Sequence, residues 1–193
     1  MNLNQFSTQF CLMQTPDDKF HNEGRFTPNA ESKTAAVLVP IIERPDGLHV
    51  LFTQRALHMR HHPGQISFPG GRQDPEDSSL IATALRESDE EIGLQSENVT
   101  PLGWLPSIHT ISNYSVYPLV GLIRELNPLN VNSDEVADVF EAPLTHFLNR
   151  NDHFTIRPIF GNSIHRVHFM PYQNRLIWGA TAAILDKLAS HFE

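Results

Sequence analysis

The sequence predicts an α/β fold in which a mixed β-sheet carries helices on both faces. Short strand-like segments outnumber segments with helical periodicity, and a long amphipathic helix follows the first three strands. A length of 193 residues is that of one domain, and 40% hydrophobic residues suffice for a sizeable core. No repeat of fixed period is present, which excludes solenoids and repeat arrays.

The N-terminal half divides into a lead-in and the first strands. Residues 1–33 form a polar lead-in that we expect to pack on the body, in part as one short helix, and residues 34–193 form the main domain. Nearly continuous apolar runs at 35–43 and 48–55 predict two buried strands. The Pro and Gly of 44–47 between them predict a tight reversal, so the two strands form a hairpin.

The helices are predicted from apolar spacing and from their end signals. The long helix covers 79–91, with Asp77 or Ser78 as its N-cap and Gly93 as its terminator. A last amphipathic helix is predicted over 177–191. Short apolar segments separated by Pro, Asn and Gly predict the remaining strands, at 65–68, 102–105, 114–123, 136–142, 155–160 and 167–172. A helical turn is predicted at 143–149.

Charge and cysteine content exclude several classes of function. With 22 Asp and Glu against 14 Lys and Arg, the formal net charge of −8 argues against a nucleic-acid partner. One cysteine, Cys11, excludes an intrachain disulfide and a multi-cysteine zinc site, and it fits the reducing cytoplasm. No apolar run approaches the roughly 20 residues that span a bilayer, so we expect no membrane partner.

The helix at 79–91 carries a concentration of acidic side chains. Between residues 74 and 91 seven acids accompany a single base, Arg86. At about 100° per residue, Glu87, Glu90 and Glu91 share one arc beside the buried face, while Asp89 points away from it. Like charges so placed repel, and oxygen ligands without cysteine favour Mg²⁺ or Mn²⁺ as the compensating cation. Spacing alone leaves the alternative of a solvated outer helix face open.

The arrangement of these residues resembles a known family motif. The core of the Nudix box is an Arg-Glu pair, two residues, a Glu-Glu pair, one residue, a glycine and an apolar residue. It resembles the run Arg86-Glu87, Glu90-Glu91 and Gly93-Leu94, preceded by Gly71. The resemblance implies the Nudix fold, an α/β/α sandwich with a mixed sheet, and metal-dependent hydrolysis of a nucleoside diphosphate derivative. Gly71 and Asp77 each stand one residue early, which indicates a one-residue insertion, and Ser88 occupies a usually apolar position.

The residues upstream of the box resemble one branch of the family. The run 51–71, which ends in Phe68-Pro69-Gly70-Gly71, is similar to the signature of the coenzyme A pyrophosphatase branch, and the similarity extends over roughly 35–190. It implies cleavage of coenzyme A or its thioesters into 3',5'-ADP and 4'-phosphopantetheine or its acyl derivative. Hydrolysis of ADP-ribose or another nucleoside diphosphate derivative is the alternative within enzymes, and a non-catalytic nucleotide-binding domain is the alternative outside them.

Roles for individual residues follow from the resemblance. It implies that Glu87, Glu90 and Glu91 hold the metal together with the backbone at Gly70 or Gly71, and that Arg86 orients the glutamates. The general base stays open between Glu90 and Glu135.

A basic loop precedes the double glycine. Arg55, Arg60 and His61 in this loop are candidates for binding an anionic substrate group such as a 3'-phosphate, and a solvated surface loop is the alternative. Trp178 is interpreted as a core residue in preference to an adenine-stacking one. The sequence leaves the oligomeric state open, a homodimer included.

Overall fold

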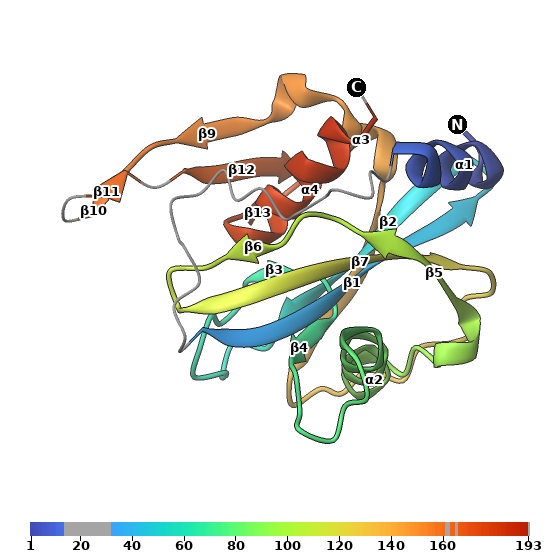
Figure 1. Ribbon diagram of the computed structural model, residues 1–193, viewed down its shortest axis with the longest axis horizontal. Coiled ribbons are helices and arrows are strands. Elements are labelled where there is room, and N and C mark those ends of the chain that lie inside the picture. Colours follow the sequence, from blue (N-terminus) through green and yellow to red (C-terminus); the bar gives the residue numbers. More distant parts are fainter. Residues whose placement is uncertain (14–31, 161–162, 165, 193) are drawn as a thin grey trace.

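The computed structural model describes residues 1–13, 32–160, 163–164 and 166–192, and it has a mixed β-sheet between layers of helices (Figure 1). The prediction of an α/β fold with a mixed sheet is confirmed. Its elements in chain order are α1 Leu3–Met13, β1 Lys33–Arg44, β2 Gly47–Arg55, β3 Ile66–Ser67, β4 Gly70–Arg72, α2 Leu80–Ile92, η1 Ser96–Asn98, β5 Val99–Trp104, β6 Ile108–His109, β7 Tyr114–Ile123, β8 Val136–Pro143, α3 Leu144–Leu148, η2 Arg150–Asp152, β9 Phe154–Ile156, β10 Ile159–Phe160, β11 Ser163–Ile164, β12 Val167–Tyr172, β13 Arg175–Trp178 and α4 Ala180–Ser190.

The main sheet is organised around β1. Its strand order is β3-β2-β1-β7-β5, with β4 paired to β1, β6 to β7 and β8 to β2. β1 runs parallel to β7 and antiparallel to both β2 and β4. It pairs with β2 through 41–44 and with β4 through 35–37, so the glycine-rich β4 lies beside β1 where β2 does not.

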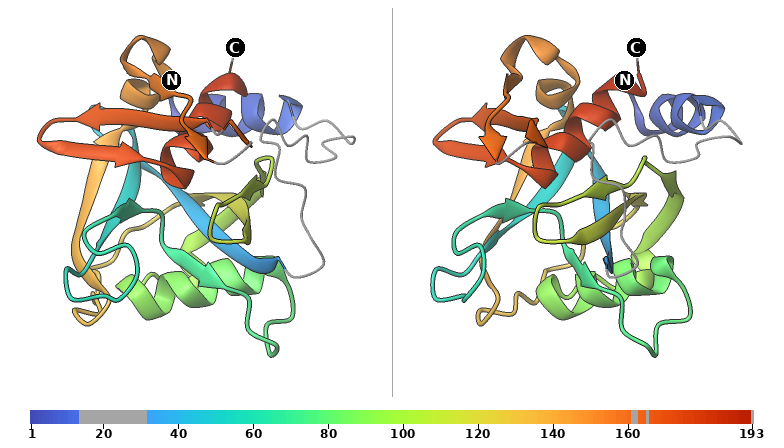
Figure 2. Two further views of the ribbon diagram at one scale, coloured as in Figure 1. Left: turned by 90° about the vertical axis from the view of Figure 1, so that its left-hand side faces the viewer. Right: turned by 60° about the vertical axis from the view of Figure 1, so that its left-hand side comes forward.

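Alternation along β1 divides the core between the two faces of the sheet. Ala35, Val39 and Ile41 belong to the larger apolar cluster, which includes residues of α1, α3 and α4. Ala36, Leu38 and Ile42, one step out of phase, belong to a smaller cluster that includes Ala84 and Ile92 of α2. Figures 1 and 2 show α2 on one side of the sheet and the other helices on the opposite side, as predicted.

The ends of α2 are set by local capping. Gly93 ends the helix in the left-handed conformation (φ 69°), which confirms the predicted terminator. The N-cap prediction was wrong: Ser79, not Asp77 or Ser78, is the cap, and its hydroxyl oxygen accepts a hydrogen bond from the Ala82 amide at 3.1 Å. Asp77 is thereby left outside the helix, and its carboxylate is engaged elsewhere.

The C-terminal segments differ from the prediction in two places. The expected helix over 177–191 begins only at Ala180, because Ile177 and Trp178 belong to β13 and Gly179 separates the two elements with φ 66°. The expected strand 155–160 is divided into β9 and β10, with Pro158, which cannot donate a ladder hydrogen bond, between them. Trp178 is 40% exposed, so its interpretation as a core residue was wrong.

The N-terminal helix contributes to the core. Phe6 and Phe10 are fully buried, and the ring of Phe6 stacks on that of Phe192 with centroids 4.9 Å apart. Lead-in residues 14–31 lie outside the described part of the chain. None of the helices in the described ranges combines the length and the apolar composition needed to cross a bilayer.

Candidate active site

The double glycine forms the first wall of the site. Gly70 has φ 147°, and a Cβ atom there would fall 2.5 Å from the carbonyl oxygen of Ala36 in β1. Its amide donates a hydrogen bond of 3.2 Å to Oε2 of Glu91. A glycine is therefore required for β4 to approach β1 while its backbone also contacts the C-terminal half of α2.

Gly71 contacts a second helix carboxylate. A Cβ atom at this position would lie 2.5 Å from both Cδ and Oε2 of Glu87. The Glu87 carboxylate thus occupies the space that the missing side chain leaves. The backbone of the double glycine and the carboxylates of α2 therefore lie against each other.

This contact gives a direct prediction for Gly71→Ala. The added methyl group would displace the flexible Glu87 carboxylate without straining the fold, and we expect kcat to fall about 100-fold, as for a displaced catalytic group. Gly47→Ala is the control. Gly47 has φ 128° with nothing within 4 Å of its added Cβ, so this variant should lose stability and keep its turnover. Kinetics and thermal unfolding of both variants test the prediction, and normal turnover of Gly71→Ala would contradict it.

Arg86 connects the acids of the cluster. Its Nε and Nη2 donate to the two carboxylate oxygens of Asp77, each at 2.9 Å. Its Nη1 donates to Glu87 at 3.1 Å and to Glu90 at 2.9 Å. Nη2 also donates to the carbonyl oxygen of Arg72 at 3.2 Å, which joins α2 to the end of β4.

The pair of Arg86 and Asp77 is strongly polarised. The hydrogen bonds from Arg86 hold the pKa of Asp77 well below its usual range, and those to Asp77 raise the pKa of Arg86 above its usual value. Thr83 donates a further hydrogen bond of 2.9 Å to Asp77. Asp77 therefore fixes the guanidinium that in turn contacts Glu87 and Glu90.

Glu91 is the most deeply placed carboxylate of the cluster. It is 5% exposed, and burial raises its pKa to about 8. The charges of Glu87 and Glu135 raise this pKa further, while the hydrogen bond from Gly70 and the charge of Arg55 lower it. Burial likewise raises the pKa of Glu87, against the opposing effect of Arg86. Burial is thus the main cause of both shifts, and the arginines beside the site offset it only in part.

The structure brings most of the predicted site residues together. Glu87, Glu91, Gly70 and Gly71 face one another across the turn, and the side chain of Glu90 is 57% exposed on the same helix. Glu135, from the segment before β8, and Arg55, at the end of β2, lie near enough for their charges to act on the pKa of Glu91.

Two of the predicted substrate-binding residues lie apart from the helix acids. Arg60 and His61 are exposed in the loop between β2 and β3. The base of this loop is held next to Glu135, because the amide of Ala56 donates to the Glu135 carbonyl oxygen at 2.8 Å. The neighbouring His58 lies within hydrogen-bonding distance, 3.0 Å, of the Asp134 carbonyl oxygen.

The pairing of Asp77 with Arg86 was not predicted from the sequence. The one-residue insertion shifted Asp77 from the position that the family motif provides, which hid its pairing with Arg86. The signal that could have found it is the absence of another base between 74 and 91, since a buried acid there has only Arg86 as a partner within the segment. Ser88, the other departure, is fully buried and donates to the Ala84 carbonyl oxygen at 2.7 Å, so its polarity is satisfied.

The donor set of this cluster suits a hard divalent cation. Carboxylate oxygens and backbone carbonyl groups are the ligands that Mg²⁺ and Mn²⁺ prefer. Among the described residues no three acidic, histidine or cysteine side chains already converge as a metal site, and Glu87 and Glu90 are both bonded to Arg86. The observation that favours a cation there is the approach of the Glu91 and Glu87 carboxylates to the backbone of the double glycine.

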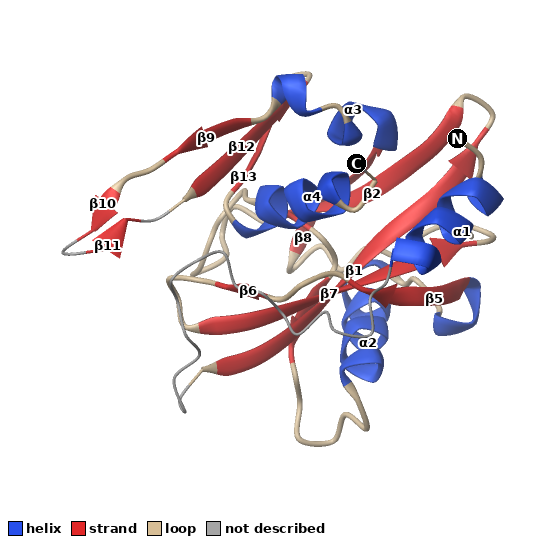
Figure 3. Cartoon of the chain, turned by 45° about the horizontal axis from the view of Figure 1, so that its top comes forward, coloured by secondary structure: helices blue, strands red, loops and turns tan. Residues whose placement is uncertain are grey.

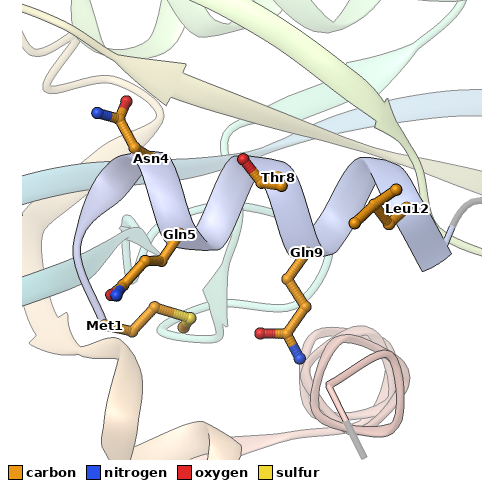
Figure 4. Close-up of a pocket in the computed structure, with 6 residues that line it drawn as sticks. All are labelled: Met1, Asn4, Gln5, Thr8, Gln9 and Leu12. Atoms are coloured by element: carbon orange, nitrogen blue, oxygen red, sulfur yellow. The ribbon is translucent and has the colours of Figure 1, made fainter.

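Two cavities lie outside the acid cluster. A cleft of about 140 Å³ opens just before the glycine turn, lined by Val37, Gln65, Ser67, Phe68, Val116, Ala180, Thr181 and Ile184. A larger groove of about 630 Å³ runs along α1 and is lined by Met1, Asn4, Gln5, Thr8, Gln9 and Leu12 (Figure 4). None of the predicted site residues lines the larger groove, so its size does not connect it with the carboxylate chemistry.

Comparison with known proteins identifies the family. Residues 32–172 match the profile of the NUDIX domain. The chain belongs to the Nudix family. A Nudix hydrolase of Yersinia enterocolitica, NudL, described as uncharacterized, is 40% identical over 97% of this chain and 91% of its own length. The NudL protein of Yersinia pestis, also described as uncharacterized, is 41% identical over 97% of this chain and 93% of its own length.

Solved structures agree at the level of the fold. The Nudix hydrolase RenU of M. smegmatis superposes with a TM-score of 0.51 at 22% identity, over 60% of this chain and 73% of its own. Membership of the family makes this protein a Nudix hydrolase, an enzyme that acts on the pyrophosphate bonds of nucleoside diphosphate derivatives.

Proposed function

We propose that this Nudix hydrolase cleaves the diphosphate bridge of coenzyme A or its thioesters in the cytoplasm, with Mg²⁺ or Mn²⁺ as cofactor. The products would be 3',5'-ADP and 4'-phosphopantetheine or its acyl derivative. The observation that carries the proposal is the pair of carboxylates, half-buried Glu87 and buried Glu91, held against the double glycine. The run 51–71, similar to the coenzyme A pyrophosphatase signature, supports the choice of substrate.

The metal would be held by the carboxylates of Glu87, Glu90 and Glu91 and by the backbone at Gly70 or Gly71. When bound, the ion would act as a Lewis acid on the diphosphate oxygens, neutralising their charge and making phosphorus more electrophilic. Arg86 positions Glu87 and Glu90 through the hydrogen bonds described above, while Asp77 fixes the guanidinium.

A carboxylate must also accept a proton from the attacking water. Glu90 and Glu135 are the two candidates, and each has a supporting feature. Glu90 is exposed and hydrogen-bonded to Arg86, so it can reach substrate in the open part of the site. Glu135 stands just before β8, close enough for its charge to raise the pKa of both Glu87 and Glu91.

The basic loop is the proposed contact for the 3'-phosphate of coenzyme A. Arg60 and His61 are exposed, and the loop that carries them is tied to the segment around Glu135. We expect Arg60→Ala to raise KM for coenzyme A about 10-fold, with much less effect on dephospho-coenzyme A, because a charge-assisted hydrogen bond contributes roughly 1.5–3 kcal/mol. Arg124→Ala, which removes an exposed arginine next to β7, is the matched control. Equal changes in KM for both substrates would contradict the assignment.

The substrate is tested by product release from coenzyme A, ADP-ribose and a dinucleotide, each with and without Mn²⁺. We expect hydrolysis to depend on the ion and to favour coenzyme A. Similar rates for all three would overturn the choice of substrate, and preference for ADP-ribose would favour the alternative activity. Binding of nucleotide without turnover under every condition would indicate a binding domain.

A further inference from the structure

A small sheet projects from the body near the C-terminus. β12 pairs antiparallel with β13 on one side and with β9 on the other, and β10 and β11 form a hairpin beyond them (Figures 1 and 3). Phe169 is the Cα partner of both Phe154 and Trp178. Because directly opposed residues share a face, this register assigns every residue of the three strands to one of two faces.

One face of this sheet packs on the body through β12 and β13, while Thr155 of β9 on the same face is exposed. Met170 and Ile177 are buried in the main core. His168, also in β12, is 9% exposed. On the same face, the guanidinium of Arg175 lies 4.0 Å from the ring centroid of Phe140, and it donates to the Asp138 carboxylate at 2.7 Å. These contacts with β8 and the core fix the orientation of the small sheet, so its other face points outward.

The outward face is apolar at all of its positions. The register places there Phe154, Ile156, Val167, Phe169, Pro171, Leu176 and Trp178. Five of these are exposed: Phe154 at 56%, Ile156 at 52%, Leu176 at 49%, Trp178 at 40% and, in addition, Pro171. The outer face of an antiparallel sheet is ordinarily polar, so an unbroken apolar face of this kind indicates a surface that is covered in the working protein.

We propose that this outward face is the interface with a second copy of the chain. Neither of the two cavities is lined by its residues, which argues for a flat partner surface over a small ligand. The chain has a net charge of −8, yet none of the seven positions on this outward face is charged. A partner that binds through charged groups therefore does not fit this face. A twofold axis would place the apolar face of one chain against the same apolar face of the other.

The available area agrees with a dimer. The exposed parts of these side chains amount to roughly 400–600 Å² of apolar surface per chain, and a standard interface buries about 800 Å² per partner, of which somewhat over half is apolar. The aromatic pair Phe169 and Trp178, stacked with centroids 6.3 Å apart, lies where the three strands meet and provides a rigid centre for the contact.

Sedimentation equilibrium over about 1–100 µM full-length protein tests the proposal, a range in which interfaces of this size are populated. The wild type is expected to behave as a dimer. Phe154→Glu and Leu176→Glu each place a carboxylate in the apolar contact of both copies, and each should raise the dimer dissociation constant at least about 30-fold. Ile111→Glu, which changes a 65% exposed apolar residue outside the small sheet, is the control and should remain dimeric.

The outcomes that would overturn the proposal are distinct. A wild type that is monomeric at every concentration would refute it, as would charged variants that dimerise as tightly as Ile111→Glu. Monomers that co-sediment with phosphatidylglycerol-containing vesicles through Phe154 would identify a lipid surface as the occupant instead. Should either variant fail to unfold cooperatively, Ile156→Glu supplies the same charge on the same face. The readout is association rather than turnover, so it is independent of the proposed substrate.

Discussion

Glu91→Gln is expected to lower kcat by about 100- to 1000-fold while making the metal-free protein more stable. The loss follows from the contribution of several kcal/mol that a metal centre supplies to charge stabilisation. The gain in stability follows from burial, which raises the pKa of Glu91 to about 8, so that its charged form is unfavourable in the folded protein. Glutamine keeps an oxygen that can accept the hydrogen bond from Gly70 and carries no charge.

The pH dependence gives the sign of the stability effect. Because the folded pKa is raised, the folded wild type retains a proton that the unfolded chain releases near pH 4.5, and stability is lost as pH rises toward about 8. The glutamine variant lacks this dependence. Above pH 8 its free energy of unfolding in metal-free buffer should exceed that of the wild type by roughly 1–3 kcal/mol, as when a buried charge is replaced by a neutral group.

Asp89→Asn is the control for Glu91→Gln. Asp89 lies on the same helix, is exposed and accepts a hydrogen bond of 2.7 Å from Gln95. Its replacement should leave turnover and the pH dependence of stability nearly unchanged. Mn²⁺ should raise the melting temperature of the wild type and of Asp89→Asn but not that of Glu91→Gln. A glutamine variant with normal turnover, or one stabilised by Mn²⁺ like the wild type, would remove Glu91 from the proposed ligands.

Arg86→Ala is expected to give the largest loss of stability in the site, about 2–4 kcal/mol. The change leaves Asp77, whose side chain is 6% exposed, with a buried charge that has lost two short hydrogen bonds. Removing one partner of a fully buried ion pair costs about 3–5 kcal/mol, and the 31% exposure of Arg86 reduces this figure. Chemical denaturation measures the change, and turnover should fall as well because Glu87 and Glu90 lose their common donor.

A double mutant separates the two contributions of Arg86. Asp77→Ala combined with Arg86→Ala removes the unpaired buried charge, so it should recover part of the stability but none of the turnover. Arg44→Ala is the control, since Arg44 forms a comparable pair with Glu141, about a third and a quarter exposed, remote from the turn. It should cost at most about 1 kcal/mol and preserve activity. Equal losses from Arg86→Ala and Arg44→Ala would contradict the central position given to Arg86.

Periodicity was sufficient to predict α2 and its acidic arc, because both depend on local spacing. It could not rank the three acids by depth. Glu91 is buried and Glu90 is exposed because β4 contacts only one edge of the arc, and the position of β4 depends on its register with β1 at 35–37. Register between segments distant in sequence is not visible in the spacing of either segment.

The predicted start of the last helix was wrong because strand pairing decided the structure there. Ile177 and Trp178 fall within the predicted helix 177–191, yet they pair with Met170 and Phe169 of β12. Trp178 was expected in the core because large aromatic residues usually bury, and the register instead places it on the outward face of the small sheet. Strand pairing overrode helical spacing in both cases.

The parallel pairing of β1 with β7 also governs how the molecule assembles. Lys33 lies opposite Tyr114, so the ends of a long intervening stretch, which contains β4 and all of α2, must meet before this pair can form. Closing so long a loop costs chain entropy before the contacts between β1 and β7 can stabilise the fold. We therefore expect the hairpin of β1 and β2 and the helix α2 to gain structure first, and the pairing of β1 with β7 to form in a later, slower step of folding.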